Sequence, residues 1–73
     1  MGANAEQIFI HNGAAEPEHV HPFQAIRCEV ISGSLCFRIA AIERSIGPGE
    51  VVDIPRNVPH TFWNAGDSEA HAI

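Results

Sequence analysis

The sequence predicts an all-β fold, a small antiparallel β-barrel or sandwich that forms one domain. Short runs rich in β-branched and aromatic residues recur along the chain, and turn-forming residues separate them. No stretch of ten or more residues repeats its apolar positions with the period of an α-helix. Strands at this spacing are typical of small barrels and sandwiches.

Seven segments have the composition of strands: residues 7–10, 25–31, 35–40, 42–46, 51–54, 60–64 and 69–73. The run Gly47-Pro48-Gly49 is the strongest turn signal between them. Gly33 followed by Ser34 predicts a two-residue hairpin turn with glycine first. We therefore expect the third segment to return antiparallel beside the second.

The second segment shows the alternation of a half-buried strand. Ile26, Cys28 and Val30 share one face of it, whereas Arg27 and Glu29 share the other. We expect the first set to face the interior and the carboxylate of Glu29 to point away from it.

The charge balance disfavours nucleic acid and anionic membranes as partners. The chain has nine acidic and four basic side chains and a net charge of −5, which repels phosphate groups. It contains neither a basic leader followed by an apolar run nor eighteen consecutive apolar residues, so we expect a soluble, cytoplasmic protein. Cys28 and Cys36 lack a Cys-x-x-Cys spacing, which is typical of buried thiols in a reducing compartment.

The size of the chain predicts that it needs additional support. A chain of 73 residues buries only about 60% of the surface of its unfolded state, so we expect a bound ion or a partner subunit to add stability. Phe23 and Trp63 favour a homodimer, because Trp63 has the parity opposite to Phe62 and is expected to face outward. The last segment runs to the end of the chain, so we expect either a fragment or a barrel completed by a partner strand.

Three histidines are the candidate metal ligands. His19 and His21 are separated by one residue, so on an extended backbone their rings leave the same face, with Cα atoms roughly 7 Å apart. His60 follows a proline-rich turn at the start of a strand, where it can supply a third imidazole. Three rings that meet at one point can bind a divalent first-row ion. The alternative is that they are only polar lining.

Strand parity also predicts the lining of a cavity around these rings. Ile26 and Cys28 lie on the interior face of one strand, and Phe62 and Asn64 share a face with His60. Such a cavity is mostly apolar, which suits a small organic acid or an aromatic ligand better than a sugar. The alternative is that these residues fill a core, with Asn64 bound to the backbone of a neighbouring turn.

Residues 13–33 resemble the first motif of the cupin family. The family's first glycine, His-x-His pair and closing glycine fall in step at Gly13, His19, His21 and Gly33. The position of the family's glutamate holds Ile26.

Residues 49–64 resemble the second cupin motif, with matches at Gly49, Pro55, His60 and Asn64. Asn57 stands where the family has a glycine, at a turn that favours a residue tolerant of positive φ. The match covers about residues 13–70 and implies a small jelly-roll β-barrel, with a single cupin domain over residues 1–73.

The resemblance also implies chemistry. In the family pattern three histidines and one glutamate hold a divalent iron, manganese, nickel or zinc ion, and here only the three histidines remain. Such a site is similar to the three-histidine iron sites of the cysteine and diketone dioxygenases. The sequence has no tyrosine, which excludes a tyrosyl acid or a cysteine to tyrosine crosslink. Gln24 is a candidate for an additional ligand or a substrate contact, and its alternative is a solvent-facing side chain.

Two functions follow as hypotheses. The first is a metal-dependent enzyme, such as a dioxygenase, that acts on a small organic molecule bound beside the ion. The second is a non-catalytic cupin that binds a small ligand or a metal as a sensor or accessory module. The three histidines favour the first hypothesis, and the isoleucine at the glutamate position favours the second.

Overall fold

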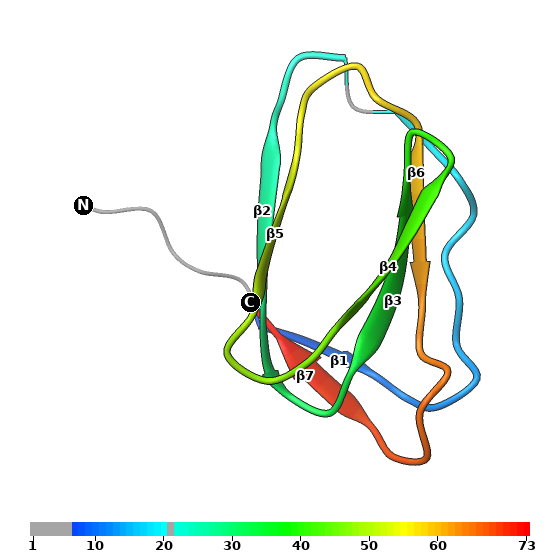
Figure 1. The fold of residues 1–73 in the computed structure, drawn as a ribbon, viewed down its shortest axis with the longest axis vertical. Helices are drawn as coiled ribbons and strands as arrows, with labels where there is room; N and C mark the ends of the chain where they lie inside the picture. The colour runs from blue at the N-terminus through cyan, green and yellow to red at the C-terminus, as the bar shows by residue number, and fades with distance from the viewer. Residues whose placement is uncertain (1–6, 21) are drawn as a thin grey trace.

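The computed structural model describes residues 7–20 and 22–73, which fold into two antiparallel β-sheets that face each other (Figure 1). The strands are β1 (Ile8–Ile10), β2 (Ile26–Ser32), β3 (Leu35–Ile39), β4 (Ile42–Ile46), β5 (Val51–Ile54), β6 (His60–Trp63) and β7 (Ala70–Ala72). The described residues contain no helix that could cross a membrane. The predicted all-β fold is confirmed, and each strand lies within one residue of its predicted ends.

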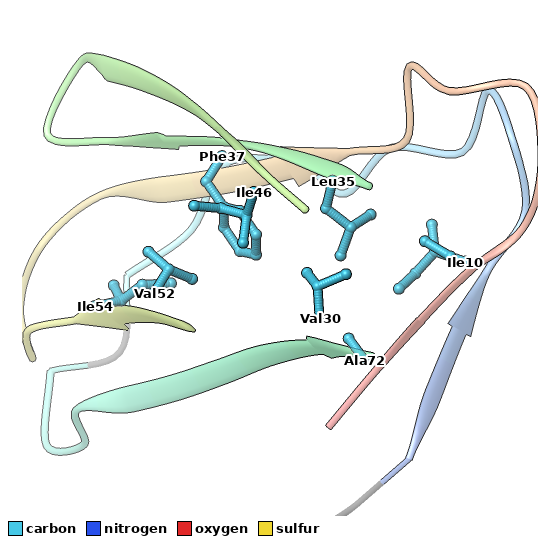
Figure 2. Close-up of a cluster of buried hydrophobic side chains, with 9 residues drawn as sticks. Ile10, Val30, Leu35, Phe37, Ile46, Val52, Ile54 and Ala72 are labelled. Carbon is cyan, nitrogen blue, oxygen red and sulfur yellow. The ribbon is translucent and has the colours of Figure 1, made fainter. Parts of the chain in front are cut away.

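The two sheets enclose the hydrophobic core. One sheet has the strand order β1-β7-β2-β5 and the other the order β4-β3-β6. Side chains from both sheets point into the space between them (Figure 2). The buried apolar residues are Ile10, Val30, Leu35, Phe37, Ile46, Val52, Ile54, Ala70 and Ala72. Burial of each large aliphatic or aromatic side chain stabilises the fold by about 1.5–3 kcal/mol.

The alternation predicted for β2 is confirmed. Val30 is fully buried and Ile26 and Cys28 are half-buried, whereas Arg27 and Glu29 are exposed. The inner face of this strand therefore contributes to both the core and the wall of the cavity described below.

The predicted hairpin at Gly33 and Ser34 is wrong. β2 and β3 belong to different sheets, so this connection carries the chain from one sheet to the other. In the predicted hairpin β3 would lie beside β2. In the structure β7 lies there instead, and Val30 pairs with Ala72. Gly33 has a φ of +75° and passes so close to β7 that an added Cβ would lie 2.8 Å from the Cα of Ala70. Both the positive φ and the close approach require glycine.

Ala40 and Ala41 form the two-residue turn between β3 and β4. Ile39 pairs with Ile42 across the turn, and both alanines have positive φ, 51° and 67°, as in a type I′ hairpin. This conformation strains an alanine by about 1–2 kcal/mol. The N–H of Ala40 donates to the carbonyl of Pro59 at 3.0 Å, which joins the turn to the loop that precedes β6.

Two asparagines stabilise the loops around β6. Asn57 has a φ of 65°, so the prediction of a turn residue tolerant of positive φ is confirmed. Asn64 is 1% exposed, and its Nδ2 donates to the carbonyls of Ile10 at 2.8 Å and Ser68 at 3.0 Å. Its Oδ1 accepts from the N–H of Gly66 at 2.9 Å. The amide of Asn64 thus joins the turn after β6 to the end of β1.

The two aromatic residues expected on the outside differ in exposure. Phe23 is 86% exposed. Trp63 is half-buried, because Ala15 pairs beside it and the guanidinium carbon of Arg38 lies 5.7 Å from its ring centroid, within reach of a cation–π contact. The chain itself therefore covers much of Trp63.

Replacing Gly33 tests the crossing between the sheets. Gly49 has a similar φ of +83° but open space where a Cβ would lie, so Gly49→Ala should lower the free energy of unfolding by about 1 kcal/mol. Gly33→Ala should lower it by about 3 kcal/mol, because the backbone of β7 must also move. Urea unfolding followed by tryptophan fluorescence measures both losses. Equal losses would show that Gly33 does not lie against Ala70.

Replacing Ala40 and Ala41 by Asn and Gly should stabilise the protein. This pair adopts the type I′ conformation with little strain, so we expect the free energy of unfolding to rise by about 1–2 kcal/mol. Thermal unfolding followed by circular dichroism measures the change. Ala25→Gly is the control, since Ala25 does not have positive φ, and it should leave stability unchanged or lower it. A loss of stability in the double variant would contradict the turn assignment.

Candidate functional site

His19 and His60 lie side by side, where the chain that precedes β2 meets the start of β6. Their backbones form an antiparallel bridge, and the N–H of each donates to the carbonyl of the other at 2.9 Å. The ring centroids are 4.4 Å apart and the ring planes are inclined by 64°, an edge-to-face arrangement. The fold therefore brings together two of the three histidines predicted as ligands.

A backbone carbonyl two residues earlier in the chain holds each imidazole. Nδ1 of His19 lies 2.7 Å from the carbonyl oxygen of Pro17, and Nδ1 of His60 lies 2.9 Å from that of Val58. A carbonyl can only accept a hydrogen bond, so each neutral ring carries its proton on Nδ1 and its lone pair on Nε2. Histidines that ligate metals commonly show this kind of hydrogen bond, which fixes the tautomer and the orientation of the ring.

A bulge before His19 sets its ring against that of His60. Ala15 pairs with Trp63 and His19 pairs with His60. Between these two pairs the chain advances by four residues from Ala15 to His19 but by only three from His60 to Trp63, so the first segment has one extra residue. Pro17 lies in this irregular stretch, where its nitrogen cannot donate to a regular ladder. An extra residue on one strand bends it and re-aims the side chains that follow.

Two other predicted ligands are not part of this pair. His21 lies outside the described residues. Gln24 is exposed and does not border the cavity next to the imidazoles. Within residues 7–20 and 22–73, no group of three or more His, Cys, Asp or Glu side chains is placed to hold a metal ion. The described part of the candidate site is therefore a pair of histidines.

A cavity of about 580 Å³ lies between the sheets and is bordered by both imidazoles. Ile26, Cys28 and Phe62, which strand parity placed on its wall, line it. Asn64 does not, because its amide binds the backbone of β1 and of the turn after β6. The volume falls in the range of small-molecule binding sites.

Cys28 is an uncharged part of the cavity wall. Burial raises the pKa of its thiol, because the thiolate is poorly solvated away from water. At neutral pH the side chain is therefore a thiol, which behaves as a small apolar group and not as an activated nucleophile.

Glu16 is an acidic residue at the cavity that the sequence analysis did not single out. It borders the cavity together with His19 and His60. Its N–H donates to the carbonyl of Phe62 at 3.0 Å, and its own carbonyl accepts a hydrogen bond from the hydroxyl of Thr61. In a regular strand Glu16 and His19 would face opposite sides, and the bulge between them allows both to border the cavity.

This arrangement can bind either a cation or a polar head group. Two neutral imidazoles in the Nδ1-protonated tautomer each offer Nε2 as a ligand or as a hydrogen-bond acceptor. The largely apolar cavity beside them lowers the local dielectric constant, which strengthens either interaction.

Comparison with protein families gives one assignment for most of the chain. A family model described as a cupin domain matches residues 7–73. A search of curated protein sequences gave no match.

Three solved structures illustrate the similarity of the fold. The TT1209 protein of Thermus thermophilus has a TM-score of 0.86 and 24% identity, over 92% of this chain and 64% of its own. A predicted oxalate decarboxylase from Thermotoga maritima has a TM-score of 0.85 and 17% identity, over 90% of this chain and 57% of its own. An oxalate oxidase in complex with glycolate has a TM-score of 0.83 and 27% identity, over 90% of this chain and 37% of its own.

This chain spans less than two thirds of the length of each of these proteins. Their likeness therefore bears on the barrel and not on the regions beyond it. The two facing antiparallel sheets, the paired histidines of the two predicted motifs and the family match over residues 7–73 lead to one assignment. The chain belongs to the cupin family.

Proposed function

We propose that this cupin binds a divalent metal ion and, beside it, a small organic molecule. His19 and His60 are the ligands within the described residues, and His21 is the expected third. The observation that carries the proposal is the His19–His60 pair, in which backbone carbonyls hold both rings in the ligating tautomer. Three neutral imidazoles suit iron, manganese, nickel or zinc.

The residues around the pair have distinct roles in this proposal. A divalent ion bound there supplies a Lewis acid that polarises a carboxylate or carbonyl oxygen. The carbonyls of Pro17 and Val58 keep the imidazoles oriented before any ligand arrives. Ile26 borders the cavity at the position where the family pattern has a glutamate, so no carboxylate from this position competes with an anionic ligand.

The reaction that fits this site best is the oxidation of a small organic acid by dioxygen, as in the three-histidine iron dioxygenases. The set of three imidazoles supports this class, because it leaves more than one coordination position for substrate and oxygen. The oxalate oxidase named above holds glycolate, a small organic acid. That likeness supports a carboxylate as the head group of the ligand.

A non-catalytic ligand-binding cupin is the second candidate. It is favoured by the cavity wall, where Ile26 and Cys28 supply apolar surface near the histidines, and neither is a general acid or base at neutral pH. In this case the protein binds its ligand without turning it over.

Metal content tests the proposal. Protein purified without chelator, or titrated with ferrous, manganous, nickel or zinc ions, should hold close to one equivalent by inductively coupled plasma mass spectrometry. His19→Gln and His60→Gln should each weaken metal affinity at least about tenfold, because each removes an imidazole that is positioned in advance.

His11→Gln is the matched control, since His11 is exposed and lies outside both motifs, and it should bind metal like the unaltered protein. Circular dichroism confirms that each variant is folded. Metal content below about a tenth of an equivalent, with no uptake on titration, contradicts the metal site and leaves the non-catalytic function. Equal losses in all three variants would show that the ion binds elsewhere.

A further inference from the structure

We propose that the cavity selects monocarboxylic acids with an apolar body, such as aryl or branched alkyl acids, over dicarboxylic acids of similar length. This inference rests on the proposed function, because it takes the metal ion held at the His19–His60 end as the group that binds the carboxylate. It goes beyond the likeness to an oxalate oxidase, because it concerns the apolar wall of this chain's own cavity.

The wall next to the imidazoles is apolar on both sheets. Phe62 lies two residues after His60 on β6, roughly 7 Å along the strand, and its ring centroid is 5.6 Å from that of Phe37. On the opposite sheet Ile26 and Ile54 are paired with each other. All four of these apolar side chains border the cavity. A ligand held by the imidazoles therefore meets hydrocarbon as soon as it extends past its head group.

The apolar wall continues toward β1. Leu35, Ile10 and Ala72 border the cavity, and each is buried. Figure 2 shows Leu35 and Ile10 in succession along the space between the sheets, on the side away from Ile54. A two-carbon acid reaches little of this surface, whereas an apolar body removes it from water, which is favourable in proportion to the area buried.

The described wall has no place for a second carboxylate. Its one arginine or lysine is Arg27, whose Nε donates to Asp53 at 2.9 Å on the exposed face of the sheet. Glu16 also borders the cavity and repels a second negative charge. A carboxylate without a partner against an apolar wall is costly, so one carboxylate at the imidazoles is favoured over two.

Acetate, phenylacetate and glutarate separate the contribution of the carboxylate from that of the rest of the molecule. Each acid is titrated by calorimetry into the protein before and after loading with metal. Phenylacetate should bind about ten- to a hundredfold more tightly than acetate, from burial of its ring. Glutarate, whose second carboxylate reaches the apolar wall instead of the ion, should bind no more tightly than acetate. Ile26→Gln should reduce this preference severalfold, while Ile42→Gln, at an isoleucine that is 66% exposed on β4, should leave it unchanged.

The two cysteines report where the acid lies. Cys28 borders the cavity, whereas Cys36 lies on β3 between the inward-facing Leu35 and Phe37 and so on the other face of that strand. Saturating phenylacetate should slow the alkylation of Cys28 by N-ethylmaleimide severalfold and leave that of Cys36 unchanged. Peptide mass spectrometry measures the two rates in one sample.

Equal affinities for acetate and phenylacetate, binding of glutarate as tight as that of phenylacetate, or no binding of any of the three acids overturns the inference. Unchanged alkylation of Cys28, or equal slowing at Cys28 and Cys36, also overturns it, because the acid then lies outside the cavity. Metal content of the same samples tests the proposed function separately. Metal uptake without the preference overturns the cavity inference and leaves the proposed metal site. A preference for phenylacetate without bound metal contradicts the metal site and leaves only the selection by the apolar wall.

Discussion

The backbone bridge between His19 and His60 is the interaction on which the candidate site depends. Two reciprocal hydrogen bonds of 2.9 Å join the chain that precedes β2 to the first residue of β6. The two rings lie 4.4 Å apart beside this bridge, and the carbonyls of Pro17 and Val58 fix their orientation. A site held in this way loses little conformational entropy when a ligand binds.

Much of the fold could be predicted because strand alternation and turn chemistry are local. The inward Val30 and the positive φ of Asn57 both followed from the residue and its neighbours. The neighbours of β3 could not be predicted in the same way, because a glycine with positive φ suits a hairpin and a crossing between sheets equally well. β7, from the far end of the chain, decides the outcome by pairing with β2 and passing against Gly33.

At the site, the alternation of inward and outward residues along a strand predicts only part of the cavity wall. It placed Ile26, Cys28 and Phe62 at the wall, but Glu16 became apparent only once the bulge before His19 was known. Asn64 is the opposite case, since it shares the parity of Phe62 but lies just past the end of β6, where its amide binds backbone instead. The contact between His19 and His60 was predicted only from the resemblance to the family's motifs, because a contact between segments so far apart in sequence has no local signal.

Asn64 links the stability of the chain ends to that of the strand that begins with His60. β1 is three residues long and, within the described chain, pairs with β7 alone, so by itself it would open readily. The amide of Asn64 binds its last carbonyl and that of Ser68 just before β7. Fraying of β1 therefore breaks a buried hydrogen bond of the residue that follows β6, which couples the opening of β1 to the end of the histidine strand.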